Sequence, residues 1–177
     1  MSVGAATRPV RVAIALGSNL GDRARHLSWA LGALGTVLSD LRHSPFDNTT
    51  PVGVPDLQPD YLNAVAVGST SLTPRQLLDT LLRLEGERFR VRPGVRAART
   101  LDLDLILYGD RVIDEPGLAV PHPRYRERDF VLGPLAALAP RWRDPQSGQT
   151  LATMWRTRRL PGGGQAASAS GGPQPAD

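Results

Sequence analysis

Two aspartates stand two residues apart in a run of leucines, in the stretch RTLDLDLILYG at residues 99–109. In a strand, Asp102 and Asp104 would point to the same face. Their Cα atoms would then lie roughly 7 Å apart, and two like charges at that distance repel by about 2 kcal/mol at an effective dielectric of 20. Paired carboxylates at this spacing suit Mg²⁺, or a pair of Mg²⁺ ions, as in phosphoryl-transfer sites. The alternative is a solvated outer face, because Asp-x-Asp is a common pattern.

Leucines occupy every second position from Leu101 to Leu107 in this stretch. Simple alternation predicts one face made of leucines and another that carries the acids. The leucine face would hold Leu101, Leu103, Leu105 and Leu107, and the acid face Asp102, Asp104, Ile106 and Tyr108.

Arginines are concentrated directly before the aspartates. Five fall within twelve residues: Arg88, Arg90, Arg92, Arg96 and Arg99. Their guanidinium groups suit bidentate binding of phosphate, so a phosphate-binding loop beside a metal site would have this composition. All 21 basic residues of the chain are arginine, and a GC-rich genome would explain that choice equally well.

Three other segments offer weaker signals. Tyr61 and Asn63 share a strand face, where a ring and an amide could bind a flat heterocycle, although plain packing is the more common use. His122 lies between two prolines in VPHP, where a lone exposed histidine is the default. GSNLGD at residues 17–22 lacks the glycine spacing and the lysine of a P-loop.

The elements that must position these residues follow from hydrophobic spacing. Strands are expected at 10–17, 41–49, 60–69 and 99–109. The first helix carries Leu27, Leu31, Leu34 and Leu38, and the second begins with Thr73 as N-cap, Pro74 in the first turn and Gln76 at N3. The order β-α-β-β-α-β predicts an α+β, ferredoxin-like sandwich with an antiparallel sheet and additional C-terminal elements.

Length and composition limit the classes of protein and of chemistry that are possible for this chain. The chain has 177 residues, a net charge of +4 and no cysteine, which excludes disulfides and thiol chemistry. We expect one domain at 10–160, with disordered tails at 1–9 and 161–177, because the C-terminal segment has no large apolar side chain. No apolar run approaches the length of a membrane span and no signal-peptide layout is present, so a soluble cytoplasmic protein is expected.

Taken together, the segments resemble one family, the 6-hydroxymethyl-7,8-dihydropterin pyrophosphokinases of folate biosynthesis. The resemblance runs through ALGSNLGD, TTPVG, QPDYLNAV, RVR, RTLDLDLILYG, VPHPRYRERDF and GPL. It implies a ferredoxin-like fold and transfer of diphosphate from the co-substrate ATP to the pterin hydroxymethyl group, with release of AMP. It also implies two Mg²⁺ ions, a monomer, and no nucleic acid or membrane as partner.

The resemblance assigns roles residue by residue. It implies that Asp102 and Asp104 bind metal, and that Arg90 and Arg99 act on the transferred phosphates. It places ATP contacts at Glu85, Arg92, His122 and Arg128, and a pterin pocket at Thr49, Val52, Tyr61, Asn63 and Phe130. Tyr61 and Phe130 would sandwich the ring, and Asn63 would bind its polar edge.

The chain also departs from the family pattern. VRAAR stands where the family often has Arg-Trp-Gly-Pro-Arg, one residue shorter, so a tryptophan is missing and the role of Arg96 stays open. Phe89 stands where glycine is common, and Pro123 where an aromatic residue can occur. These departures concern loop closure and leave the metal site intact.

Two other classes share this topology. A small RNA-binding domain would carry base-stacking aromatics on its central strands, where this chain carries two acids that repel nucleic acid. A ligand-sensing regulatory domain would need neither the acids nor the arginines. Titration calorimetry with ATP, Mg²⁺ and a pterin separates the three classes.

Overall fold

The computed structural model describes residues 8–50, 59–88 and 100–160. Its central sheet runs in the order β2-β4-β1-β5, with β3 paired to β4, and all of these pairings are antiparallel. The strands are β1 (Val10–Ser18), β2 (Ser39–His43), β3 (Asp47–Thr49), β4 (Tyr61–Thr70) and β5 (Asp102–Tyr108). The β-α-β-β-α-β order is therefore confirmed, with the expected strand at 41–49 divided into β2 and β3.

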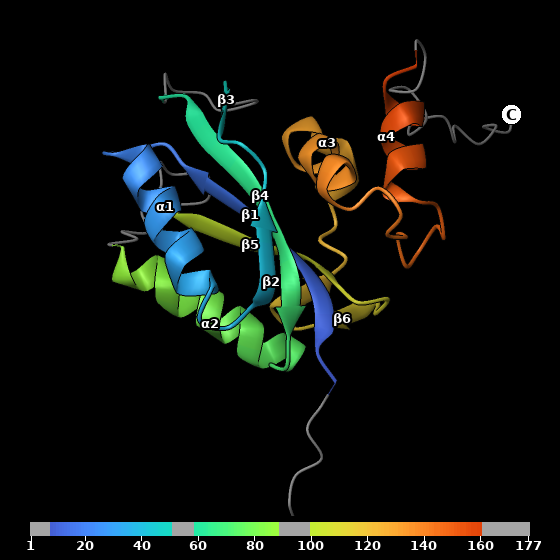
Figure 1. Ribbon diagram of the computed structural model, residues 1–177, viewed down its shortest axis with the longest axis horizontal. Helices are drawn as coiled ribbons and strands as arrows, with labels where there is room; N and C mark the ends of the chain where they lie inside the picture. The colour runs from blue at the N-terminus through green and yellow to red at the C-terminus, as the bar shows by residue number, and fades with distance from the viewer. Residues whose placement is uncertain (1–7, 51–58, 89–99, 161–177) are drawn as a thin grey trace, which may run out of the picture.

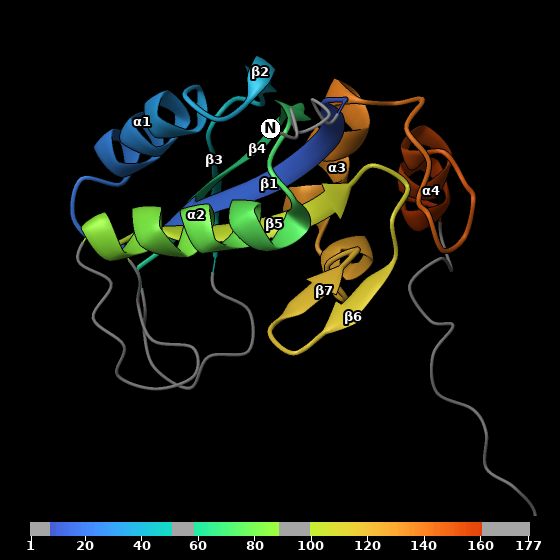
Figure 2. The ribbon, with the colours of Figure 1, turned by 90° about the horizontal axis from the view of Figure 1, so that it is seen from below.

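Helices cover both faces of the sheet. Helices α1 (Arg23–Leu34) and α2 (Pro74–Glu87) pack on one face, and α3 (Asp129–Leu138) packs on the other, with α4 (Leu151–Arg158) beside α3 (Figures 1 and 2). A β6–β7 hairpin (Ile113–Glu115 and Leu118–Val120) and the short 3₁₀ helix η1 (Tyr125–Glu127) connect β5 to α3. These are the additional C-terminal elements that the sequence predicts.

The helix starts follow from local chemistry. The Thr73 side chain accepts a hydrogen bond from the Gln76 backbone N–H, the Gln76 side chain accepts one from the Thr73 backbone N–H, and Pro74 occupies the first turn. This is the capping box that the sequence predicts. Helix α1 ends at Leu34 with Gly35 as its cap, so Leu38 lies beyond the helix although it is buried.

The sheet separates two cores because its side chains alternate. Leu27, Leu31 and Leu34 of α1 and Leu77, Leu81 and Leu84 of α2 pack on Val12, Ile14 and Leu16 of β1. On the opposite face, Val131, Leu132 and Leu135 of α3 pack on Ala13 and Ala15. The small β1 side chains on this second face leave room near Gly17, where the candidate site lies.

The alternation predicted for β5 fails after Leu105. Ile14 pairs with Leu105 and Ala13 with Leu107, so Ile106 is an extra residue in a β-bulge. Leu107 consequently turns to the α3 side, while Tyr108 joins the α1–α2 core and donates its hydroxyl to the Leu72 carbonyl at 2.7 Å. The assignment of Leu107 to the leucine face and of Tyr108 to the acid face was therefore wrong.

None of the helices in the described ranges is long and apolar enough to cross a membrane. The expected tails at 1–9 and 161–177 fall almost entirely outside these ranges, with only residues 8 and 9 described.

Candidate active site

A groove of about 700 Å³ opens on the α3 side of the sheet. Its floor is formed by residues 15–17 of β1 and by parts of β4 and β5, and its wall by the segment from His122 to Val131. The expected site residues that line it are Thr49, Tyr61, Asn63, Asp102, Asp104, His122, Arg128 and Phe130. Residues far apart in the sequence therefore meet in one groove.

The two aspartates share the groove face of β5. Asp102 pairs with Gly17 and Asp104 with Ala15 in the β1–β5 register, and both aspartates are half-buried. Asp104 Oδ2 accepts a hydrogen bond from Arg128 Nη1 at 3.2 Å and lies 3.8 Å from His122 Nε2. The Arg128 cation from the wall therefore offsets part of the carboxylate charge.

The bulge in β5 helps to position His122. The backbone N–H of His122 donates to the carbonyl oxygen of Ile106, the extra residue, at 3.0 Å. This bond attaches the loop after β7 to β5 two residues beyond Asp104. The histidine of the VPHP loop is therefore held beside the acid pair rather than exposed alone.

The imidazole of His122 is polarised by its neighbours. Its Nδ1 accepts a hydrogen bond from the Arg124 backbone N–H at 3.2 Å, which assigns the proton to Nε2 on the Asp104 side. Burial lowers the pKa of His122; Asp104 opposes that shift and Arg128 adds to it. The ring therefore favours the neutral form, with an N–H donor facing the groove.

Two aromatic rings and an amide also line the groove. Asn63 is buried, and its Nδ2 donates to Thr49 Oγ1 at 2.6 Å. Tyr61 lies two residues before Asn63 on β4, and Phe130 faces the groove from the first turn of α3. The Arg128 guanidinium lies 5.9 Å from the centre of the Phe130 ring. Aromatic faces and a fixed amide are the groups that bind a planar heterocycle.

Gly17 makes room for this amide. A Cβ at position 17 would lie 3.1 Å from Asn63 Oδ1 and 3.7 Å from Tyr61 Cδ1. A side chain at position 17 would therefore crowd the Asn63 amide across the β1–β4 pair, and glycine avoids this contact.

Glu85, expected among the ATP contacts, does not line the groove. It is 2% exposed, and its Oε1 accepts the Leu103 backbone N–H at 2.8 Å. Leu103 separates the two aspartates, so Glu85 supports β5 from the α2 side. Four expected residues, Val52, Arg90, Arg92 and Arg99, lie outside the described residues, as do Arg96 and Phe89.

The groove also contains charged residues that sequence reasoning missed. These are Arg124, Glu127, Asp129 and Arg158. The first three lie within VPHPRYRERDF, so their place in that motif was a usable signal. Arg158 comes from α4 and had no such signal, because no spacing pattern connects it to the motifs.

A buried carboxylate anchors the wall from below. Asp144 is fully buried and accepts hydrogen bonds from Tyr125 Oη at 3.0 Å, from Arg126 Nη2 at 2.6 Å and from the Ser147 backbone at 3.0 Å. Burial would raise the pKa of Asp144, but these bonds, led by that from Arg126, lower it to about 2. Burial and Asp144 also raise the pKa of Tyr125.

Metal binding in this groove would depend on few protein ligands. Across the described ranges, no group of three or more His, Asp or Glu side chains is arranged to hold a metal ion. Asp102 and Asp104 are the candidate ligands. One or two carboxylates are what a protein usually supplies to Mg²⁺ when phosphate oxygens and water complete its coordination shell.

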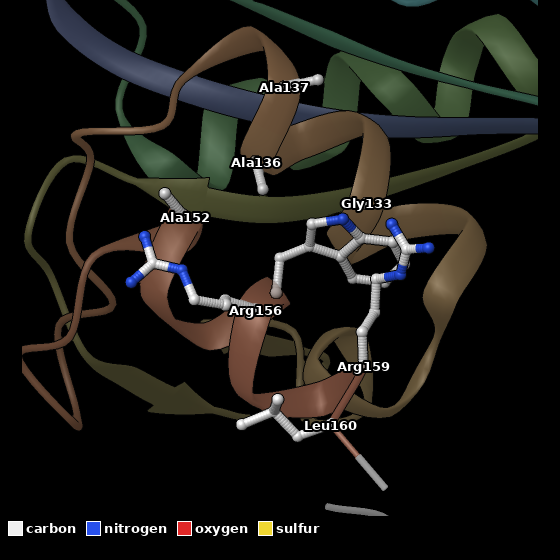
Figure 3. A pocket seen from close by; sticks show the side chains of 8 residues that line it. Gly133, Ala136, Ala137, Ala152, Arg156, Arg159 and Leu160 are labelled. Carbon is white, nitrogen blue, oxygen red and sulfur yellow. The ribbon is translucent and has the colours of Figure 1, made fainter.

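A second hollow of about 550 Å³ lies between α3 and α4 (Figure 3). Gly133, Ala136 and Ala152 line it together with Arg156 and Arg159, and a Cβ at Gly133 would approach the Trp155 ring to 3.0 Å. None of the expected site residues lines this hollow.

Comparison with known proteins identifies a family for the chain. A family model described as 7,8-dihydro-6-hydroxymethylpterin-pyrophosphokinase (HPPK) matches residues 13–140, more than two thirds of the chain. The chain belongs to this family. HPPK relatives include the 2-amino-4-hydroxy-6-hydroxymethyldihydropteridine pyrophosphokinase of Synechocystis, 42% identical over 78% of this chain and 71% of the relative. The enzyme of the same name from Haemophilus influenzae is 44% identical over 71% of this chain and 79% of the relative.

Solved HPPK structures share the fold. The HPPK-DHPS of Plasmodium falciparum aligns with a TM-score of 0.67 at 13% identity, over 84% of this chain and 44% of that chain. This HPPK chain therefore spans less than half of that fused protein. The fold likeness confirms the α+β, ferredoxin-like architecture.

Membership of the HPPK family defines the reaction class. The chain is a transferase of folate biosynthesis that transfers diphosphate from ATP to 6-hydroxymethyl-7,8-dihydropterin. Its substrates are small molecules. The RNA-binding and regulatory alternatives are set aside.

Proposed function

We propose that the groove between the sheet and α3 is the site of diphosphate transfer, with Asp102 and Asp104 as its metal ligands. The observation that carries this proposal is the presence, in one groove, of two carboxylates, of Arg128 and His122 beside Asp104, and of a ring-binding end. Two Mg²⁺ ions are proposed. When bound, Mg²⁺ would neutralise phosphate charge and polarise the transferred group.

The donor set fits this metal. Both aspartates supply oxygen only, and both side chains remain partly exposed to the groove, so water and phosphate oxygens have access. Magnesium prefers such hard oxygen ligands and retains several waters.

Nucleotide binding is proposed for the wall that carries His122 and Arg128. The Nε2–H of His122 and the guanidinium of Arg128 are donors that suit phosphate oxygens. Arg90, Arg92 and Arg99 are proposed to act on the same phosphates, from the sequence alone. Glu85 is proposed to act on the nucleotide side through β5, since its carboxylate holds the Leu103 backbone N–H between the two aspartates.

The pterin is proposed to bind at the opposite end, between Tyr61 and Phe130. Asn63, fixed by Thr49, would hydrogen-bond the polar edge of the ring, and Val52 is proposed as a further contact from the sequence alone. Such a pose would hold the hydroxymethyl group near the phosphates, and most of the acceleration would come from positioning and electrostatics. The proton acceptor is left unassigned.

The point of attack distinguishes this reaction from that of an ordinary kinase. Attack on the β-phosphorus gives AMP and a pterin diphosphate, whereas attack on the γ-phosphorus gives ADP and a monophosphate. Chromatography of a reaction with ATP, Mg²⁺ and 6-hydroxymethyl-7,8-dihydropterin is the test. Enzyme-dependent AMP supports the proposal, and enzyme-dependent ADP refutes it.

We further propose that residues 10–160 form the pyrophosphokinase domain, that the protein acts as a monomer, and that it works in the cytoplasm. Size-exclusion chromatography with light scattering tests the oligomeric state. A dimer that persists at assay concentration would contradict it.

A further inference from the structure

Arg158 contributes a charge to the active-site groove from outside the region that matches the family model. That match ends at residue 140, whereas Arg158 is the last residue of α4. Its side chain nevertheless lines the same groove as Asp102, Asp104 and Phe130. No role had been expected for it.

Two contacts attach Arg158 to the groove wall. Its Nε donates to Asp129 Oδ1, and its Nη2 donates to the Glu127 carbonyl at 2.7 Å. These partners stand immediately before and after Arg128. One guanidinium therefore spans the residue that contacts Asp104.

The held segment is the junction between two helical elements. It joins the end of η1 to the start of α3, and Arg128 there has an extended backbone with φ −98° and ψ 100°. The α3 N-cap makes no side-chain capping hydrogen bond. A planar donor group that bridges a carboxylate and a carbonyl can fix such a junction.

Two side chains at this junction face the proposed ligands. Arg128 reaches Asp104 on the proposed nucleotide side, and Phe130 forms a wall of the proposed pterin end. The direction of both side chains depends on the backbone between Glu127 and Asp129.

We propose that Arg158 is a positioning residue for the known reaction, which holds the 127–129 junction so that Phe130 and Arg128 face their substrates. This inference rests on the proposed assignment of those two residues. The Arg158 and Asp129 side chains are 30% and 63% exposed, so their ion pair adds little to global stability. Loss of this ion pair should therefore weaken ligand binding and change the free energy of unfolding little.

The test uses the full chain with Arg158→Ala, Arg158→Lys, Asp129→Asn and the double variant Arg158→Ala/Asp129→Asn. Arg156→Ala is the matched control, because Arg156 lies on the same helix but lines the hollow of Figure 3 instead. The readouts are KM for the pterin, KM for ATP, kcat and Tm, with AMP formation by the wild type measured in the same assay.

Arg158→Ala should raise KM for the pterin at least about fivefold, with Tm lowered by at most about 3 °C. Arg158→Lys should recover part of the loss, since lysine keeps the charge but lacks the fork that bridges both partners. The double variant should be no worse than Arg158→Ala alone, because the two side chains act as one unit.

Three results would overturn the inference: an unchanged KM in Arg158→Ala, a change equal to that of Arg156→Ala, or fully additive losses in the double variant. Additive losses would mean that Arg158 acts on substrate without Asp129. An inactive wild type would instead count against the proposed function, so the two failures are distinguishable.

Discussion

Arg128 and Asp104 form an ion pair across the groove, with 3.2 Å between Nη1 and Oδ2. The pair connects the wall of the groove to the strand that carries the acids. Because both side chains are partly exposed, the pair is screened by water and leaves Asp104 accessible to a ligand. A cation from the wall thus moderates the repulsion between Asp102 and Asp104.

Replacing either acid should abolish most of the turnover. In Asp102→Asn and Asp104→Asn the size is kept and a metal-binding charge is lost, so kcat should fall at least about a hundredfold, or about 2.7 kcal/mol of transition-state stabilisation. Pterin binding without nucleotide should survive. Steady-state AMP formation checks the first point and calorimetry the second. Asp114→Asn, an exposed aspartate on β6, serves as the control, and full activity in both site variants would refute the assignment.

The two rings should matter to one substrate only. Tyr61→Ala and Phe130→Ala should each weaken pterin binding about tenfold or more, since ring stacking is worth about 0.5–1.5 kcal/mol beyond buried area. ATP binding should change far less. Separate titrations with pterin and with an ATP analogue give the comparison, and equal losses for both ligands would indicate a folding defect.

Gly17→Ala should impair the pterin end through Asn63. The added methyl would lie 3.1 Å from Asn63 Oδ1, so the amide must shift and strain its 2.6 Å bond to Thr49. Loss of one hydrogen bond is worth about 1 kcal/mol, or about a fivefold weaker pterin affinity. Gly32→Ala is the control, because a Cβ in that helix meets nothing within 4 Å. An unchanged affinity in Gly17→Ala would show that Asn63 does not bind the ring.

Stability should depend on pH through Asp144. Its pKa is about 2 in the folded protein and 3.8 in its unperturbed state, so the unfolded chain takes up the proton first as pH falls. The contribution, about 2 kcal/mol, is present above pH 4 and is lost between about pH 4 and pH 2. Urea unfolding of the wild type at pH 7, 4 and 2.5 should show this loss, and Asp144→Asn should be weaker at pH 7 with a flatter profile. Parallel profiles for the two proteins would contradict it.

Deleting residues 161–177 should leave Tm and turnover essentially unchanged. The expectation comes from composition, since the segment PGGGQAASASGGPQPAD has no large apolar side chain to bury. Thermal unfolding and AMP formation of the shortened chain are the measurements. A large fall in either would mean that this segment contacts the domain.

Local pattern was sufficient for much of the architecture. The capping residues of α2 and the apolar spacing of β1 and β4 are short-range signals, and the structure has both helices and the strand order that they indicate. The bulge at Ile106 was not predictable in this way. It depends on register against β1, which is a pairing between strands about 90 residues apart.

For the groove residues, too, short-range sequence patterns identify some members and miss others. Asp104 and Tyr61 were candidates because their residue types and spacing suggest chemistry within one segment. Arg158 was missed because its signals are contacts with Asp129 and Glu127, which lie 29 and 31 residues away in the sequence. The burial of Glu85 behind Leu103 likewise depends on how α2 packs on β5, which spacing does not report.

The bulge residue Ile106 and Glu85 together affect whether the edge of the sheet can pair with a strand of another molecule. Among the described strands, β5 is the last in the sheet, so its outer edge is where a strand from another molecule could add. Along that edge the Leu103 N–H is already bonded to Glu85 and the Ile106 carbonyl to His122. An incoming strand would have to displace a buried carboxyl group and a loop, and this stretch of the edge is therefore protected against strand-to-strand aggregation.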